Sequence, residues 1–241
     1  MKADLFIPCF IDQLYPQTAF SVMKLLKRAG VEVHYNPEQT CCGQPAFNSG
    51  YWKEARSLAV KFMQDFADAT VVVTPSASCA GYIRNYYGRL FDENPELLSR
   101  FEQLKPQVYE LSDFLVNFLN ITDFGTRFPH RITYHDGCSA LREYGIKAEP
   151  RTLLMNVKGL ELVEMKETDT CCGFGGTFSV KFRHISTALT QLKVEHAMET
   201  GAEYIVSSEA SCLMNLEGYI RKMKLPVRTI HLADILAHGM D

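Results

Sequence analysis

Eight cysteines in two matching sets are the feature of this sequence that most constrains its fold. Each set has a single cysteine, then an adjacent pair, then another single cysteine. The intervals are 31 and 36 residues in the first set, and 32 and 39 in the second. The sets are Cys9, Cys41, Cys42 and Cys79, and Cys138, Cys171, Cys172 and Cys212. This repetition predicts a duplicated chain in which each half brings four thiols together from three distant places.

Other residues recur in the same order. Cys41-Cys42-Gly43 returns as Cys171-Cys172-Gly173, Ala77-Ser78-Cys79 as Ala210-Ser211-Cys212, and the apolar stretch Leu111–Leu115 as Leu232–Leu236. A period near 120 residues is too long for a solenoid repeat. We therefore predict two cysteine-rich units, residues 1–121 and 131–241, that share an interface.

Apolar and β-branched stretches alternate with helical patterns in both halves. The predicted strands are Asp4–Ile7, Val31–Val33, Thr70–Thr74, Ile132–His135, Leu160–Met165 and Tyr204–Val206. The predicted helices are Gln17–Ala29, 52–66, Pro150–Val157 and His184–Thr200, with Gly30 and Gly201 as helix stops. This order predicts an α/β fold of two pseudo-symmetric repeats, each a small, mainly parallel sheet flanked by helices, with right-handed crossovers.

The cysteines follow the predicted strands. Cys9 comes after the first strand, the adjacent pair lies in the loop after the second, and Cys79 follows the third. The second half repeats this order. Because the carboxyl ends of parallel strands form one edge, where α/β sheets bind ligands, four thiols can converge there without a local C-x-x-C motif. The pattern therefore predicts a metal centre in each half.

Composition excludes several classes of protein. A hydrophobic content of 46% is enough for an ordinary core, and a net charge of −3 without a Lys/Arg block argues against a nucleic-acid partner. The N-terminus lacks the layout of a secretory signal, and no apolar run reaches the roughly 20 residues of a membrane span. We expect a cytoplasmic protein whose thiols stay reduced.

The adjacent cysteines should not form disulfides with each other, because Cα atoms across a trans peptide are about 3.8 Å apart, closer than a bridge usually needs. Buried structural cysteines would not recur in loops in this way. Structural zinc sites usually use C-x2-C knuckles, and ferredoxin-type runs are also missing. The spacing alone predicts two sites of four thiolates and leaves zinc and iron–sulfur open.

Three motifs resemble the lactate utilisation protein A family of cysteine-rich CCG-domain iron–sulfur proteins. They are CCGQPAFNSG from Cys41, CCGFGGTFSVK from Cys171 and CLMN from Cys212. The wider superfamily includes heterodisulfide reductase, through its B subunit, and the iron–sulfur subunit of glycolate oxidase. The resemblance implies that each cysteine set binds an iron–sulfur cluster and that the protein serves the oxidation of L-lactate to pyruvate. It also implies two partners, a ferredoxin-like iron–sulfur protein and a third, small subunit.

The chain departs from these relatives at several positions. The heterodisulfide reductase relatives end each set in C-x-x-C, whereas here the flanking residues are Ser76 and Tyr82, and Glu209 and Asn215. Ser139 also replaces a histidine found in many superfamily members. We therefore expect ligation by four thiolates, with one or two sites occupied by clusters of the [4Fe-4S] class.

Residues near the second set are the candidates for proton transfer and for binding a substrate carboxylate. His135 and Asp136 precede Cys138 and could move protons. Arg142, Lys181 and Arg183 could hold a carboxylate or offset cluster charge. A purely structural interpretation is also available. His135 would then complete a strand end, Asp136 would hydrogen-bond the backbone of a turn, and the three cations would be solvated surface charges. No nucleotide or flavin motif is evident, because Gly173–Gly176 lacks G-x-G-x-x-G spacing.

The leading hypothesis is an electron-transfer subunit of a lactate-oxidising complex. A zinc-stabilised scaffold without redox activity is the main alternative, and an iron–sulfur subunit for another 2-hydroxy acid, such as glycolate, is a further one. A thiol–disulfide reductase would need an exposed, low-pKa thiolate with a resolving partner, and the missing C-x-x-C motif argues against it.

Overall fold

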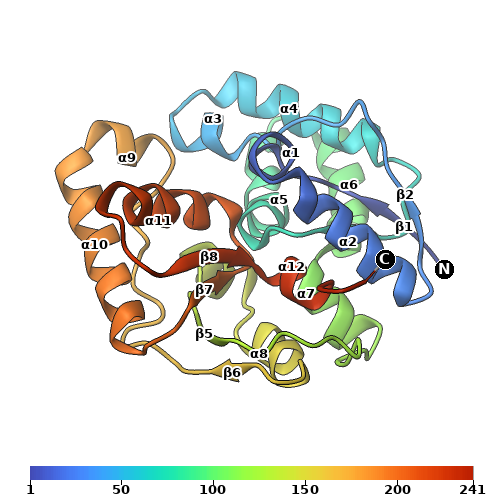
Figure 1. Ribbon diagram of the computed structural model, residues 1–241. Coiled ribbons are helices and arrows are strands. Elements are labelled where there is room, and N and C mark those ends of the chain that lie inside the picture. The colour runs from blue at the N-terminus through green and yellow to red at the C-terminus, as the bar shows by residue number, and fades with distance from the viewer. Residues whose placement is uncertain (241) are drawn as a thin grey trace.

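The structure is a computed structural model, and it describes residues 1–240. Asp241, the last residue of the predicted second unit, lies outside the described residues. Two four-stranded parallel sheets, flanked by helices, form the two halves of the molecule (Figure 1). This is the predicted α/β tandem-repeat fold. No helix in residues 1–240 combines the length and the apolar character needed to cross a membrane.

The two sheets have the same topology. The first has the order β2-β1-β3-β4 and the second the order β6-β5-β7-β8. The strands are β1 (Lys2–Leu5), β2 (Glu32–His34), β3 (Val72–Thr74), β4 (Val108–Glu110), β5 (Arg131–Tyr134), β6 (Glu161–Leu162), β7 (Tyr204–Ser207) and β8 (Arg228–His231). Each half therefore begins at an inner strand, moves to one edge, and returns through two crossovers to the other edge.

Helical segments connect these strands. In the first half they are α1 (Cys9–Leu14), α2 (Pro16–Arg28), α3 (Gln44–Asn48), α4 (Trp52–Asp65), α5 (Ala77–Leu90), α6 (Pro95–Leu104), η1 (Lys105–Gln107), α7 (Leu111–Asp113) and η2 (Phe114–Phe118). In the second half they are η3 (Ala140–Tyr144), α8 (Ala148–Met155), α9 (Thr177–Lys181), α10 (Arg183–Glu199), α11 (Ala210–Met223) and α12 (Leu232–Leu236). Segments η2 and η3 are π-helical.

The predicted elements match the observed ones with shifts of a few residues at their ends. Helix α2 buries Val22, Leu25 and Leu26, and Gly30 in a left-handed conformation follows it, as the helix-stop prediction requires. Sequence reasoning missed strands β4 and β8 and helices α5, α6 and α11. It also extended the strand at Leu160–Met165, of which only Glu161–Leu162 pairs with β5.

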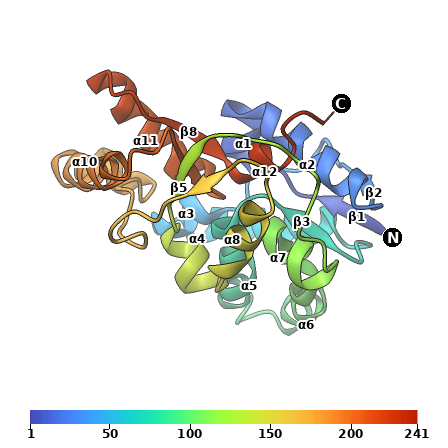
Figure 2. The same cartoon turned by 60° about the horizontal axis from the view of Figure 1, so that its bottom comes forward.

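One hydrophobic core joins the two halves. It contains Leu5 and Phe114 from the first half together with Ile132 and Leu232 from the second. Helix α12, at the end of the second half, packs on α2 of the first, and α7, at the end of the first half, packs on α8 of the second (Figures 1 and 2). Each half thus places its last helix against the first long helix of the other.

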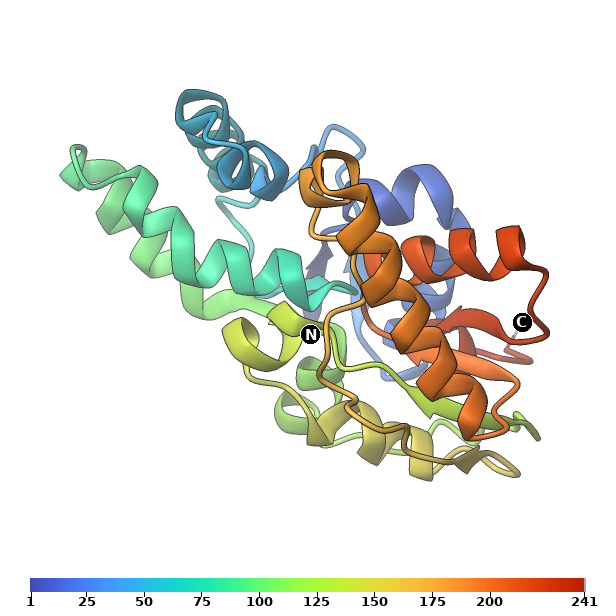
Figure 3. The same ribbon diagram turned by 90° about the vertical axis from the view of Figure 1, so that its left-hand side faces the viewer.

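A second set of contacts between the halves lies around the carboxyl ends of the strands. Helix α5 packs on η3, and α11 packs on α1. Figure 3 shows α5 extending from the middle of the molecule with η3 beside it. At Gly81 a Cβ atom would lie 3.3 Å from the backbone nitrogen of Tyr144, and Asn85 donates a hydrogen bond of 2.6 Å to the carbonyl of Glu143. The carboxyl ends of both sheets therefore meet at the interface between the halves.

Candidate metal centre

All eight cysteines line a single cavity of about 540 Å³ between the two halves. Cys9 begins α1, and Cys79 and Cys212 lie in the first turns of α5 and α11. The adjacent pairs lie in the loops after β2 and β6. Phe10 and Phe174, one from each half, meet edge to face at this cavity with ring centroids 5.4 Å apart. The two predicted sites are therefore two groups of thiols that line one cavity.

Within each set the thiols form a chain of contacts. In the first set the Sγ atoms of Cys9 and Cys41 are 3.6 Å apart, and those of Cys42 and Cys79 are 3.4 Å apart. The second set repeats this pairing, with Cys138 beside Cys171 and Cys172 beside Cys212. The structure thus brings together the four thiols that the sequence assigns to each site.

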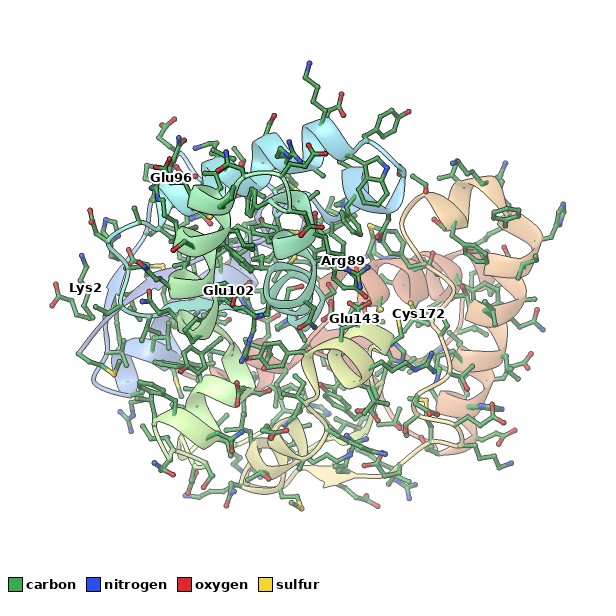
Figure 4. All side chains as sticks on the ribbon, turned by 180° about the vertical axis from the view of Figure 1, so that it is seen from behind. Lys2, Arg89, Glu96, Glu102, Glu143 and Cys172 are labelled. Carbon is green, nitrogen blue, oxygen red and sulfur yellow. The ribbon has the colours of Figure 1, made fainter. Side chains whose placement is uncertain are left out.

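Burial follows the same pattern in both sets. The first two cysteines of each set are half-buried, and the last two are buried in the cavity wall. Cys172 lies well inside the outline of the molecule, at the level of α11 (Figure 4). Both sets therefore face the cavity and are shielded on their inner side by the core of their own half.

Two glycines shape the loops of the adjacent pairs. Gly43 and Gly173 have φ angles of +94° and +89°, a left-handed conformation that favours glycine. Their N–H groups point back to the preceding cysteines, at 3.4 Å from the Sγ atom of Cys41 and 3.3 Å from that of Cys171. Such N–H donors stabilise a thiolate and tune the potential of a metal centre bound by it.

The four thiols of a set cannot all lose their protons at low cost unless a cation is bound. Hydrogen bonds from Cys42 and Cys9 lower the pKa of the Cys41 thiol to about 3, whereas the hydrogen bond to Cys41, burial and repulsion raise the pKa of Cys9. The contact with Cys171 and burial likewise raise the pKa of Cys138. Among the described residues, no Lys, Arg or His side chain lines the cavity. A bound cation is the natural counter-charge for four converging thiolates.

Glu209 is a cavity residue that sequence reasoning did not identify as part of the site. Its buried carboxylate accepts hydrogen bonds from the backbone N–H of Ser78 at 2.6 Å, from the Ser78 hydroxyl at 2.7 Å and from the Ser76 hydroxyl at 3.3 Å. Burial raises the pKa of Glu209 to about 7. Glu209 stands three residues before Cys212, as Ser76 stands three residues before Cys79. This difference between the repeats was the sequence signal that could have identified it.

The proposed proton carriers have different surroundings. Asp136 is buried and forms a bidentate ion pair with Arg151, at 2.8 and 2.9 Å, so its carboxylate has a structural partner. His135 is fully buried, and burial and the nearby Lys193 lower its pKa to about 3. One of its ring nitrogens lies within 4.8 Å of both the Cys172 and Cys212 thiols.

The proposed carboxylate-binding residues lie outside the cavity lining. Arg142, Lys181 and Arg183 are exposed side chains on η3, α9 and α10. This placement agrees with their interpretation as surface charges. The structure therefore brings His135 to the thiols and leaves Arg142, Lys181 and Arg183 outside the cavity lining.

Comparison with known proteins agrees with the repeat. The cysteine-rich domain family CCG matches the chain twice, over residues 3–84 and 132–217. The chain is 44% identical to lactate utilization protein A of Geobacillus thermodenitrificans over 238 residues, 99% of each chain. It is 38% identical over its full length to lactate utilization protein A 2 of Bacillus cereus. The chain belongs to the lactate utilization protein A family.

A solved structure shares the fold of this family member. A hypothetical protein from Helicobacter pylori superposes with a TM-score of 0.64 at 14% sequence identity. The match covers all of this chain and 49% of the other, so this chain spans about half the length of that protein. At this level of identity the likeness concerns the fold alone.

The donor atoms fit the iron–sulfur centres that the family implies. Four thiols in each half supply the four-cysteine ligation that such clusters use. Thiolates also suit zinc, so the donors fit both metals. The thiols of each half are thus donor atoms of the kind that binds these metals.

Proposed function

We propose that this chain is an iron–sulfur electron-transfer subunit in the oxidation of L-lactate to pyruvate. The first centre is held by Cys9, Cys41, Cys42 and Cys79, and the second by Cys138, Cys171, Cys172 and Cys212. The observation that carries the proposal is the single cavity that both sets line, in a member of the lactate utilization protein A family.

Two adjacent centres suit a two-electron oxidation. Conversion of lactate to pyruvate releases two electrons and two protons, and an iron–sulfur centre, when bound, accepts or releases one electron at a time. One cavity lined by both sets places two such carriers close together. The chain itself supplies the ligands, the N–H donors of Gly43 and Gly173, and the amino ends of α5 and α11, which favour negative charge.

Lactate is oxidised on a partner in this proposal. A carboxylate substrate is normally held by arginine or lysine, and the described lining of the cavity contains neither. The partners we propose are a ferredoxin-like iron–sulfur protein and a third, small subunit. The chain then receives electrons from the site of oxidation and passes them on.

The test begins with protein purified without oxygen. We expect about four to eight irons per chain with matching acid-labile sulfide, and an EPR signal that depends on the redox state. Lactate should reduce the centres when the two partners are added, and glycolate should not. Reduction by glycolate alone would assign the chain to another 2-hydroxy acid, and iron that does not respond to either substrate would contradict the proposed role.

A zinc-stabilised scaffold is the second candidate, and the two closest thiol pairs of the first set favour it. Sulfur atoms around one tetrahedral zinc lie about 3.8 Å apart, given Zn–S bonds of about 2.3 Å. The distances of 3.4 and 3.6 Å in the first set are close to that value. Stoichiometric zinc without iron or sulfide, persisting after anaerobic reconstitution, would establish the scaffold and contradict electron transfer.

A further inference from the structure

His135 is a buried histidine whose ring nitrogens make no hydrogen bond of ordinary geometry. Its exposed fraction is 0%, Nδ1 and Nε2 are unpaired within the described residues, and the carbonyl of Thr168 lies close to the ring. Burying a polar group in this way costs free energy unless something else binds it. An unmatched histidine of this kind indicates a partner that belongs to the site.

The backbone fixes the position of this residue. The N–H of His135 donates to the carbonyl of Val206 at 2.8 Å, and its own carbonyl accepts from the hydroxyl of Ser207 at 3.0 Å. His135 therefore continues the pairing of β5 with β7 at the carboxyl edge of the sheet. The ring is held there by the sheet and not by a mobile loop.

The ring reaches the second cysteine set. A ring nitrogen of His135 and the Sγ atoms of Cys172 and Cys212 all lie within 4.8 Å of one another, and all three side chains are buried. A neutral imidazole nitrogen is a common ligand for iron and zinc. These three atoms therefore have the character and the spacing of a metal-ligand group.

The first half has no such group. Phe6 stands three residues before Cys9, as His135 stands three residues before Cys138. Its ring is fully buried and packs edge to face on Phe62 and Phe66, with centroids 5.1 and 5.9 Å away. Packing alone is therefore satisfied by an aromatic hydrocarbon at this position, and it does not explain the histidine.

We propose that His135 coordinates the metal centre of the second cysteine set through a ring nitrogen. This inference rests on the proposed function only in that both sets bind metal. The first centre then has four thiolate ligands, and in the second the imidazole takes the place of one of the four thiolates named above. Because imidazole is neutral and thiolate is anionic, the imidazole raises the reduction potential of the second centre relative to the first.

The experiment uses full-length protein, labelled with ¹⁵N-histidine and purified without oxygen. Iron, sulfide and zinc are measured on the same sample. If iron is present, pulsed EPR should detect a directly bonded histidine nitrogen in the wild type, and His135→Phe, which copies Phe6, should lose it. A wild type with no nitrogen coupling, or with coupling of hydrogen-bond strength only, would overturn the proposal while leaving iron–sulfur function intact.

Two further variants control for misfolding of His135→Phe and for nitrogen coupling that comes from another histidine. His135→Cys offers a different ligand and should lose the nitrogen coupling and lower the potential of the second centre, with little change in the first. His196→Phe is the matched control, because Nδ1 of His196 is also buried without a partner, and it should keep the coupling. Coupling that disappears in His196→Phe and survives in His135→Phe would contradict the assignment.

Zinc in place of iron would contradict the proposed function without removing the test of His135. X-ray absorption at the zinc edge should then show an imidazole in the wild type and an all-sulfur shell in His135→Phe. An all-sulfur shell in the wild type would overturn the coordination by His135.

Discussion

The two halves of this molecule have the same topology and the same four thiols, yet they surround those thiols with different chemistry. Around the first set the interior is aromatic, with Phe6, Phe62 and Tyr87 in one core cluster. Around the second set the core cluster is mainly aliphatic, with Val194, Leu216 and Ile220 beside Cys172 and Cys212. Tyr87 donates to the carbonyl of Cys42 at 2.7 Å, whereas Thr190 and Asn215 donate to that of Cys172 at 2.9 and 3.0 Å.

The residues left without partners also differ between the halves. In the first half the buried hydroxyl of Tyr82, at the position of the missing second cysteine of C-x-x-C, has no hydrogen-bond partner. In the second half the corresponding Asn215 is paired, and the ring nitrogens of His135 are the unpaired buried atoms that lie beside Cys172 and Cys212. Duplication thus preserved the ligands, while the second layer around them diverged. Two centres with equal thiol sets are consequently expected to have unequal properties.

The largest effect is expected from removing one ligand in each half. Cys42→Ala should abolish the first centre, and Cys172→Ala the second, because each thiol contacts only its own set. Metal analysis should show a loss of about half in each variant, since three remaining thiols leave a four-cysteine site incomplete. If either variant lost all of its metal, the two sets would form one joint centre.

The next largest difference between the halves is expected in the stability cost of replacing the glycine that follows each cysteine pair. A Cβ at Gly173 would lie 2.4 Å from the carbonyl of Ser186, whereas one at Gly43 would lie 3.3 Å from Cβ of Leu58. Both carry the strain of positive φ, so we expect Gly43→Ala to cost about 1–2 kcal/mol and Gly173→Ala about 3–5 kcal/mol. Urea unfolding of the metal-free proteins measures both, and equal losses would contradict the packing difference.

Removal of the Glu209 carboxylate tests the contact between the halves. Glu209→Ala leaves the N–H of Ser78 and two hydroxyls without their acceptor, which should cost about 2–3 kcal/mol in the free energy of unfolding. Glu199→Ala removes an exposed ion pair with Lys166 and should have no measurable effect. If the two variants were equally stable, the buried carboxylate would not hold the halves together.

The smallest effect concerns pH, through two residues at equivalent strand ends. Glu110 and His231 accept hydrogen bonds from the backbone N–H groups of Ser112 and Ala233, respectively. Burial raises the pKa of Glu110 from 4.5 to about 8 and lowers the pKa of His231 below 6.5. The folded state therefore favours the neutral form of both residues.

The two shifts act on stability in opposite directions. Above pH 4.5 the unfolded chain loses the Glu110 proton that the folded state keeps, so stability falls as the pH rises toward about 8. Below pH 6.5 the unfolded chain gains a proton on His231 that the folded state excludes, so stability falls as pH decreases. Thermal unfolding from pH 5 to 8 should show that Glu110→Gln removes the first trend and His231→Asn the second. Unchanged pH profiles would show that neither residue is neutral in the fold.

The sequence by itself determined the duplication, the α/β class, most strands, the long helices α2, α4 and α10, and the placement of the thiols after strand ends. These features are local, because apolar periodicity, helix-stopping glycines and cysteine spacing can each be read within one segment. Strands β4 and β8 escaped because they are short, and because the apolar residues that follow them, Leu111–Leu115 and Leu232–Leu236, belong to helical turns.

Only the tertiary structure decided that both thiol sets face one cavity and that the halves exchange their last helices. Thr18 bonds to Asp234 and Ser78 to Glu209, pairs that are 216 and 131 residues apart. The tertiary structure also decided that Asp136 forms an ion pair with Arg151. It leaves the ring nitrogens of His135, beside Cys172, without a hydrogen bond of ordinary geometry. Such facts depend on which surfaces pack together, and the packing of distant segments leaves no periodic signal in the sequence.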